Sequence, residues 1–132
     1  MTDEILEPVS INGSFVDYGR ELEFLLDSAS LKLLSSRLDQ VALLCGQVNI
    51  MIGGVVLNFV CAVTNDVHFI GRPGQLQITA NRGNLQELAR KLQNLSNVNV
   101  ELVEHIDHIH LEPWFMDANE EITDIIFGRE CD

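Results

Sequence analysis

Residues Val41 to Val63 form a run of 23 residues without a charged side chain, and this run constrains the fold more than any other stretch. Its length and apolar character would suit a helix that crosses a membrane. However, Gln47, Asn49 and Asn58 interrupt the run, and Gly53-Gly54 in its middle is typical of a two-residue β-hairpin turn. No cluster of Lys or Arg flanks either end. We therefore predict paired, buried strands and no membrane span.

Further strands are predicted up to residue 80, because short runs rich in Val and Ile are divided by Gly, Asn, Asp and Pro. The predicted strands of this region are VALLC, VNIMI, VVLNFVCAV, VHFI and QLQITA. The connections between them are short, which favours antiparallel pairing. A short strand through Val9 and Ile11 precedes them.

An N-terminal helix is predicted to begin at Ser14, where an apolar stripe starts with three- and four-residue spacing. The stripe consists of Phe15, Tyr18, Leu22, Leu25 and Ala29. A break at Ser28 to Ser30 then separates this helix from a second short one, indicated by Leu31, Leu34 and Leu38.

A later helix follows the strand QLQITA, with Asn84 as its predicted cap and Glu87 completing a capping box. Its apolar face comprises Leu85, Leu88, Ala89, Leu92 and Leu95. Beyond it, NVELV, HIDHIHLE and EITDIIFG have the composition of strands. Strand, glycine-bearing turn and helix thus occur in both halves, which suggests a duplication, although few residues match.

These elements indicate an α+β fold: a single domain over residues 1–132, with a mostly antiparallel sheet and two or three helices packed on one face. The length is sufficient for one hydrophobic core. The acidic start, MTDEILEPVS, lacks the features of a secretory signal, so a cytoplasmic location is expected.

The formal net charge is −12, and its distribution is uneven. Between Asn99 and Asp132 there are ten carboxylates and one basic residue, Arg129. Repulsion from phosphate argues against nucleic acid or an anionic membrane as a ligand. A basic protein partner is favoured, and an acidic surface that only aids solubility is the alternative.

The segment HIDHIHLEPW raises the question of a metal site. On a strand, His108, His110 and Glu112 share one face, and this H-x-H-x-E pattern could serve a metal-dependent enzyme or a small-ligand-binding domain. Such residues are collinear, however, and a compact site needs a further ligand, for which His68 is the remaining histidine. In the alternative, Ile109 and Leu111 pack into the core while the histidines form a polar surface. We predict no bound metal and no cofactor.

Catalytic motifs do not support an enzyme either. The sequence contains no G-x-S-x-G elbow, no phosphate-binding GxxxxGK loop and no G-x-G-x-x-G after a strand. Cys45 and Cys61 fall in apolar segments, where a thiol stays protonated and unreactive. The protein is therefore predicted not to be an enzyme.

The order of three C-terminal segments, LQITANRGNLQELARKLQNL, HIHLEPW and EITDIIF, resembles the immunity protein 32 family of bacterial polymorphic-toxin systems. The resemblance extends over about Gln75 to Phe127. It implies a cytoplasmic, non-catalytic immunity protein that binds and neutralises a cognate toxin domain. The charge of the C-terminal quarter independently indicates that an acidic surface makes this contact. It carries over no catalytic residue.

The residues predicted to bind the toxin combine the acidic groups of the C-terminal quarter with its histidines and its single tryptophan. They are Glu104, Asp107, His108, His110, Glu112, Trp114, Asp117, Glu120, Glu121 and Asp124. Trp114 suits an interface anchor, and closure of the core edge is its alternative role. A homo-oligomer formed through the apolar strands is a further expectation.

Overall fold

The computed structural model describes residues 5–19, 21–63, 67–72, 74–97, 108–111 and 124–130. In this part of the chain it contains two helices and nine strands. In chain order they are β1 (Val9–Ile11), β2 (Ser14–Asp17), β3 (Glu21–Leu26), α1 (Ser28–Leu44), β4 (Gln47–Ile52), β5 (Val55–Cys61), β6 (His68–Arg72), β7 (Gln75–Ala80), α2 (Arg82–Ser96), β8 (His108–Leu111) and β9 (Asp124–Arg129).

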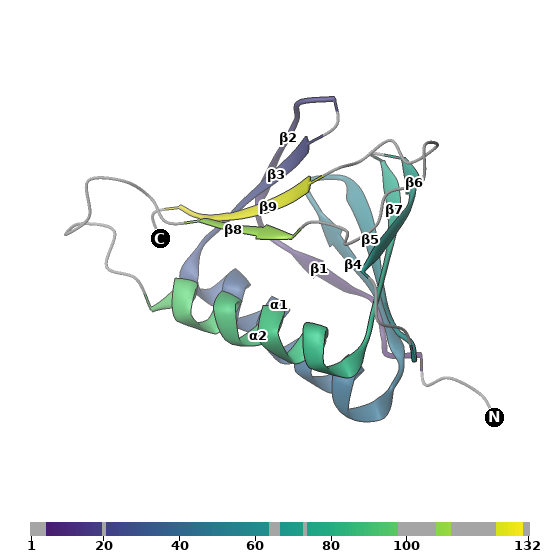
Figure 1. Cartoon of the computed structure of the whole chain (residues 1–132). Coiled ribbons are helices and arrows are strands. Elements are labelled where there is room, and N and C mark those ends of the chain that lie inside the picture. Colours follow the sequence, from purple (N-terminus) through teal and green to yellow (C-terminus); the bar gives the residue numbers. More distant parts are fainter. Residues whose placement is uncertain are drawn as a thin grey trace.

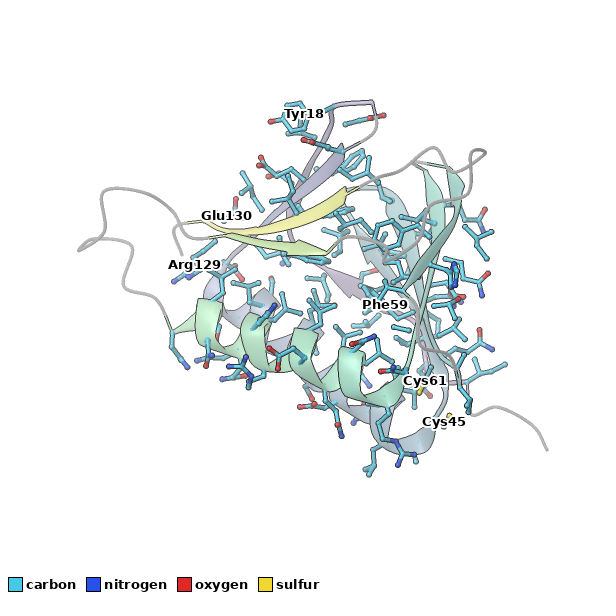
Figure 2. The ribbon with its side chains drawn as sticks, viewed as in Figure 1. Tyr18, Cys45, Phe59, Cys61, Arg129 and Glu130 are labelled. Atoms are coloured by element: carbon cyan, nitrogen blue, oxygen red, sulfur yellow. The ribbon has the colours of Figure 1, made fainter. Side chains whose placement is uncertain are left out.

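The strands form two mixed sheets. The first sheet has the order β1-β4-β5-β7-β6 and the second has the order β2-β3-β9-β8. The two sheets and the helix pair surround one hydrophobic core, to which both sheets and both helices contribute (Figure 1). Phe59 of β5 points into this core and is fully buried (Figure 2). The predicted α+β class with two or three helices is confirmed.

The uncharged run around Gly53-Gly54 forms the β4–β5 hairpin, as its turn signal predicted. Gly53 and Gly54 have φ values of 58° and 85°, which a two-residue hairpin turn requires and which glycine adopts without steric cost. The prediction of a strand at Val41–Cys45 is wrong, because residues up to Leu44 are the last turn of α1 and bury Val41 and Ala42 against the core. No helix in the described ranges is long and apolar enough to cross a membrane.

The helix predicted from Ser14 to Ala29 is also wrong, because these residues form the antiparallel β2–β3 hairpin and the start of α1. Leu22, Phe24 and Leu26 alternate with more exposed residues, and all three are fully buried. This two-residue period fits a strand whose one face covers the core. The same residues also fit the helical spacing of three and four residues. The pairing of β3 with β9 stabilises the strand, so the two-residue period is the one that the structure follows.

Both helices begin at a capping residue that directly follows a strand. Asp27 Oδ1 accepts a hydrogen bond from Ser30 N at 2.8 Å, so the predicted break at Ser28 to Ser30 is in fact the start of α1. Asn81 Oδ1 accepts from Asn84 N at 2.7 Å, so Asn81 caps α2 and Asn84 lies inside it. The second short helix predicted from Leu31 to Leu38 is part of α1.

The two halves of the fold repeat one order of elements: a hairpin, a helix and a second hairpin. In each half the strand before the helix pairs in parallel with the last strand of the other half, β3 with β9 and β7 with β5. The registers agree, because Leu26 pairs with Arg129 as Ala80 pairs with Cys61. The order of elements is therefore repeated, but not in the form that the sequence suggested, because the N-terminal unit of strand, turn and helix is a β-hairpin followed by α1.

The helices run antiparallel and are joined at three levels by side-chain hydrogen bonds to backbone carbonyls. Ser28 Oγ donates to Ser96 O at 2.9 Å, Ser35 Oγ donates to Ala89 O at 2.7 Å, and Arg82 Nε donates to Ala42 O at 2.8 Å. Each helix thus begins beside the end of the other, which fixes both under the two sheets.

Candidate functional site

Three of the ten residues predicted to bind a toxin fall on described strands. His108 and His110 occupy β8, and Asp124 begins β9. The other seven, Glu104, Asp107, Glu112, Trp114, Asp117, Glu120 and Glu121, lie outside the described residues. The choice between an anchoring and a core role for Trp114 therefore remains a prediction.

The register of the second sheet brings these three positions next to residues from the N-terminal half. Asp124 pairs with Glu21 across the parallel β3–β9 ladder, and His110 pairs with Ile126 across the antiparallel β8–β9 ladder. Ile126 in turn lies beside Glu23. The sheet thus joins β8 and the N-terminal hairpin through β9, which is buried from Ile125 to Arg129.

The outer face of the second sheet carries carboxylates on its hairpin half. On β3, Glu21 is exposed and Glu23 half-buried, and they alternate with the residues that enter the core. Aromatic contacts on the core side attach the hairpin to β9. The ring centroid of Phe24 on β3 lies 5.1 Å from that of Phe15 on β2 and 5.8 Å from that of Phe127 on β9. The hairpin is thus fixed from below while its charged side chains face outwards.

The β2–β3 hairpin projects from the body of the molecule, with Tyr18 at its tip (Figures 1 and 2). Tyr18 is 60% exposed and Val16 is 38% exposed. Gly19 N donates to Asp17 Oδ1 at 2.7 Å, which shapes the turn. Its Gly19 has a φ of 92°, a value that favours glycine. We call Val16, Tyr18, Glu21 and Glu23 the hairpin face.

Sequence reasoning missed the hairpin face because it assigned these residues to a helix. The signal that could have found it is the alternation of Leu22, Phe24 and Leu26 with Glu21, Glu23 and Leu25, together with the Asp-Tyr-Gly turn. An exposed tyrosine and valine among carboxylates have the mixed character of a protein interface, where an aromatic side chain supplies contact area.

The three histidines that the structure describes are divided between the two sheets. His68 lies on β6 of the first sheet and pairs with Thr79, whereas His108 and His110 belong to the second sheet. Within the described ranges, no three His, Cys, Asp or Glu side chains are grouped as metal ligands. Glu112, the carboxylate of the H-x-H-x-E pattern, lies outside those ranges.

A cavity of about 580 Å³ opens at the start of α2. Cys45, Cys61, Asn81 and Arg82 are among its lining residues, and those that the structure describes include no carboxylate and no imidazole. Arg82 uses its Nε to hold Ala42 O, and Cys61 is buried. The described part of the lining therefore offers two thiols and one guanidinium group.

The perturbed ionisable groups of α2 belong to a surface ion pair. Arg90 Nη2 lies 2.5 Å from Glu87 Oε1. The hydrogen bond from Arg90 lowers the pKa of Glu87, and the same bond raises the pKa of Arg90. Both side chains are exposed and three residues apart on one helix, so the pair is a local helix contact and not a site for chemistry.

Residues 75–130 match the family model of immunity protein 32. This confirms the resemblance predicted for the C-terminal part of the chain. The matched range extends from β7 through α2 and β8 to β9, and so includes strands of both sheets.

The comparison with curated proteins gave no match. Among solved structures, the crystal structure of Drosophila Suppressor of Fused is similar to this chain, with a TM-score of 0.45 and 14% sequence identity. The alignment covers 88% of this chain and 26% of that chain. This chain therefore spans about a quarter of the length of that protein.

Proposed function

We propose that this protein is an immunity protein that binds a cognate toxin domain and neutralises it without catalysis. The observation that carries the proposal is the match of residues 75–130 to the immunity protein 32 family model. The matched elements contribute to the shared core and place β9 in the middle of the second sheet. The family resemblance thus concerns the scaffold that supports the outer face of that sheet.

The partner proposed is a basic toxin domain, bound in the cytoplasm. A net charge of −12 attracts a basic protein over long distances and raises the rate of association. The carboxylates of the C-terminal quarter are the first basis for a basic partner. The hairpin face enlarges this acidic surface, because Glu21 lies beside Asp124 in the β3–β9 register. Tyr18 and Val16 supply exposed apolar contact area on the same hairpin as Glu21.

The proposal can be tested by co-expression in a bacterium with the toxin domain encoded immediately upstream. Growth rescue and co-purification of the two proteins are the expected results. If the toxin domain is toxic and this protein neither restores growth nor co-purifies with it, the immunity function is wrong.

The hairpin face is tested separately with Glu21→Lys combined with Glu23→Lys. We expect this double variant to lose rescue, because two repulsive charges would meet a basic partner. The control is Asp39→Lys, which changes an exposed carboxylate of α1 on another side of the molecule. Rescue by both variants would exclude the hairpin face from the binding surface while leaving the immunity function intact.

A further inference from the structure

The first sheet has an outer face that differs in charge from the rest of the protein. None of its five strands, β1, β4, β5, β6 and β7, contains an Asp or Glu, although the net charge of the chain is −12. Its inner face is covered by the helix pair and the second sheet, since Val48, Leu57, Phe59 and Ile78 are buried in the shared core. The outward-facing residues of these five strands therefore include no carboxylate, and Asn49 and Ile70 among them are exposed.

Side-chain amides occupy the centre of this face. The register aligns Asn49, Asn58 and Gln77 on neighbouring strands in one row, which ends at Ile70 on β6. Gln47 and Gln75 flank the row, and these six residues line a shallow groove of about 380 Å³. Ile70 is 58% exposed and adds an apolar contact at the sheet edge.

Hydrogen bonds hold three of the five amides of this face in place. Asn58 Nδ2 donates to Asn49 Oδ1 at 3.0 Å and to Gln47 Oε1 at 3.3 Å. The groups are thus ordered before any partner arrives, so less side-chain entropy is lost when this surface is covered.

We propose that this carboxylate-free face, consisting of Gln47, Asn49, Asn58, Ile70, Gln75 and Gln77, binds a second copy of the same chain and forms a homodimer. The proposal does not depend on the immunity function. Its first basis is charge, because two copies of a strongly acidic protein repel each other wherever carboxylates face carboxylates. Contact through the first sheet keeps the carboxylates of the described residues out of the centre of the interface.

The second basis is self-complementarity. A twofold interface brings the same patch of both copies together, so the patch must be complementary to itself and groups near the twofold axis meet their own kind. A carboxamide carries both a donor and an acceptor and can meet this requirement, whereas a carboxylate or an ammonium group cannot. A basic toxin would gain no charge complementarity on this face, which favours the second copy as its occupant.

The size of the face indicates a weak dimer. Five strands about 4.8 Å apart, with about 3.3 Å per residue, give a surface of roughly 20 Å by 20 Å. Two such faces give about 800 Å² in total, which is below the roughly 1,200 Å² at which stable specific interfaces begin. We therefore expect a dissociation constant in the micromolar range. It should become tighter as salt is raised, because salt screens the repulsion between the two acidic chains.

The test is sedimentation velocity of the full chain over a concentration series up to about 300 µM. The variant is Asn49→Asp with Gln77→Glu, which adds two charges per copy with almost no change of shape. We expect it to weaken dimerisation by about tenfold or more, since four carboxylates would meet in the interface. The control is Gln86→Glu with Gln93→Glu, which adds the same charge on the exposed surface of α2 and should dimerise like the wild type.

A wild-type protein that stays monomeric throughout the series would overturn the proposal, and so would a face variant that dimerises as well as the wild type. Thermal unfolding of each variant shows whether it is folded, so that a loss of dimerisation is not caused by unfolding. Loss of toxin-domain binding in the face variant, combined with a monomeric wild type, would assign the face to the toxin and refute a homodimer.

Discussion

Asp27 and Asn81 occupy equivalent positions in the two halves of the fold. Each directly follows a strand, and each accepts a hydrogen bond from the backbone N–H three residues later, at 2.8 Å for Asp27 and 2.7 Å for Asn81. The strands that precede them, β3 and β7, form the two corresponding parallel pairings with β9 and β5. In both halves, the capping residue that follows the strand therefore sets the start of the helix.

Replacement of either cap by alanine should destabilise the protein by about 1 kcal/mol, because one N-terminal amide of the helix loses its acceptor. Urea unfolding followed by circular dichroism measures the change. Asp27→Asn is the control and should be close to neutral, since Asn and Asp cap equally well. An alanine variant as stable as the wild type would show that water replaces the cap without loss.

Ser35→Ala should destabilise the packing of the helices by about 1 kcal/mol. The Ser35 hydroxyl is buried and donates to Ala89 O of the other helix at 2.7 Å, so the substitution removes a buried hydrogen bond. Ser36→Ala, at the exposed neighbouring position, is the matched control and should leave the free energy of unfolding almost unchanged. Equal effects of the two substitutions would contradict a specific role for the bond.

Gly71→Ala should destabilise the β6–β7 hairpin strongly, by about 2 kcal/mol or more. Gly71 has a φ of 121°, and an added Cβ would lie 2.4 Å from Gln75 O, which is backbone and cannot rotate away. Gly74→Ala is the control in the same hairpin, because a Cβ there meets no atom within 4 Å. Thermal unfolding should therefore separate the two variants, and similar melting temperatures would contradict the predicted clash.

Glu87→Gln should cause a small loss of stability at neutral pH that disappears in acid. The hydrogen bond from Arg90 lowers the pKa of Glu87 below its usual 4.5 in the folded state. The stabilisation is thus fully present above pH 4.5 and is lost as the pH falls through the lowered value. High salt should also reduce it, because both groups are exposed. A difference between variant and wild type that persists in acid would point to another cause.

Several elements could be predicted because their signals are local. The Gly53-Gly54 pair specifies a tight turn between two β-rich runs, and the β4–β5 hairpin forms there. The apolar face of α2 has one clear helical period, and all five of its predicted residues are buried. The C-terminal resemblance could also be recognised, because it depends on the order of residues and not on their contacts.

The N-terminal half was harder because its sequence supports two periods at once. Phe15, Tyr18 and Leu22 have helical spacing, whereas Leu22, Phe24 and Leu26 alternate as in a strand. The deciding contact is the parallel pairing of β3 with β9, a strand about one hundred residues later in the chain. Local spacing contains no information about that partner, and tertiary pairing commonly overrides local preference.

The sequence by itself determined the α+β class, the uncharged character of the β4–β5 region and the acidity of the chain, because composition and short-range spacing specify each of them. Only the tertiary structure decided which residues share a surface. It placed Glu21 beside Asp124 in the second sheet and Asn58 beside Gln77 in the first. The physical reason is that a parallel pairing joins strands that are distant in the chain, and its register is set by the burial of the core face of the whole sheet.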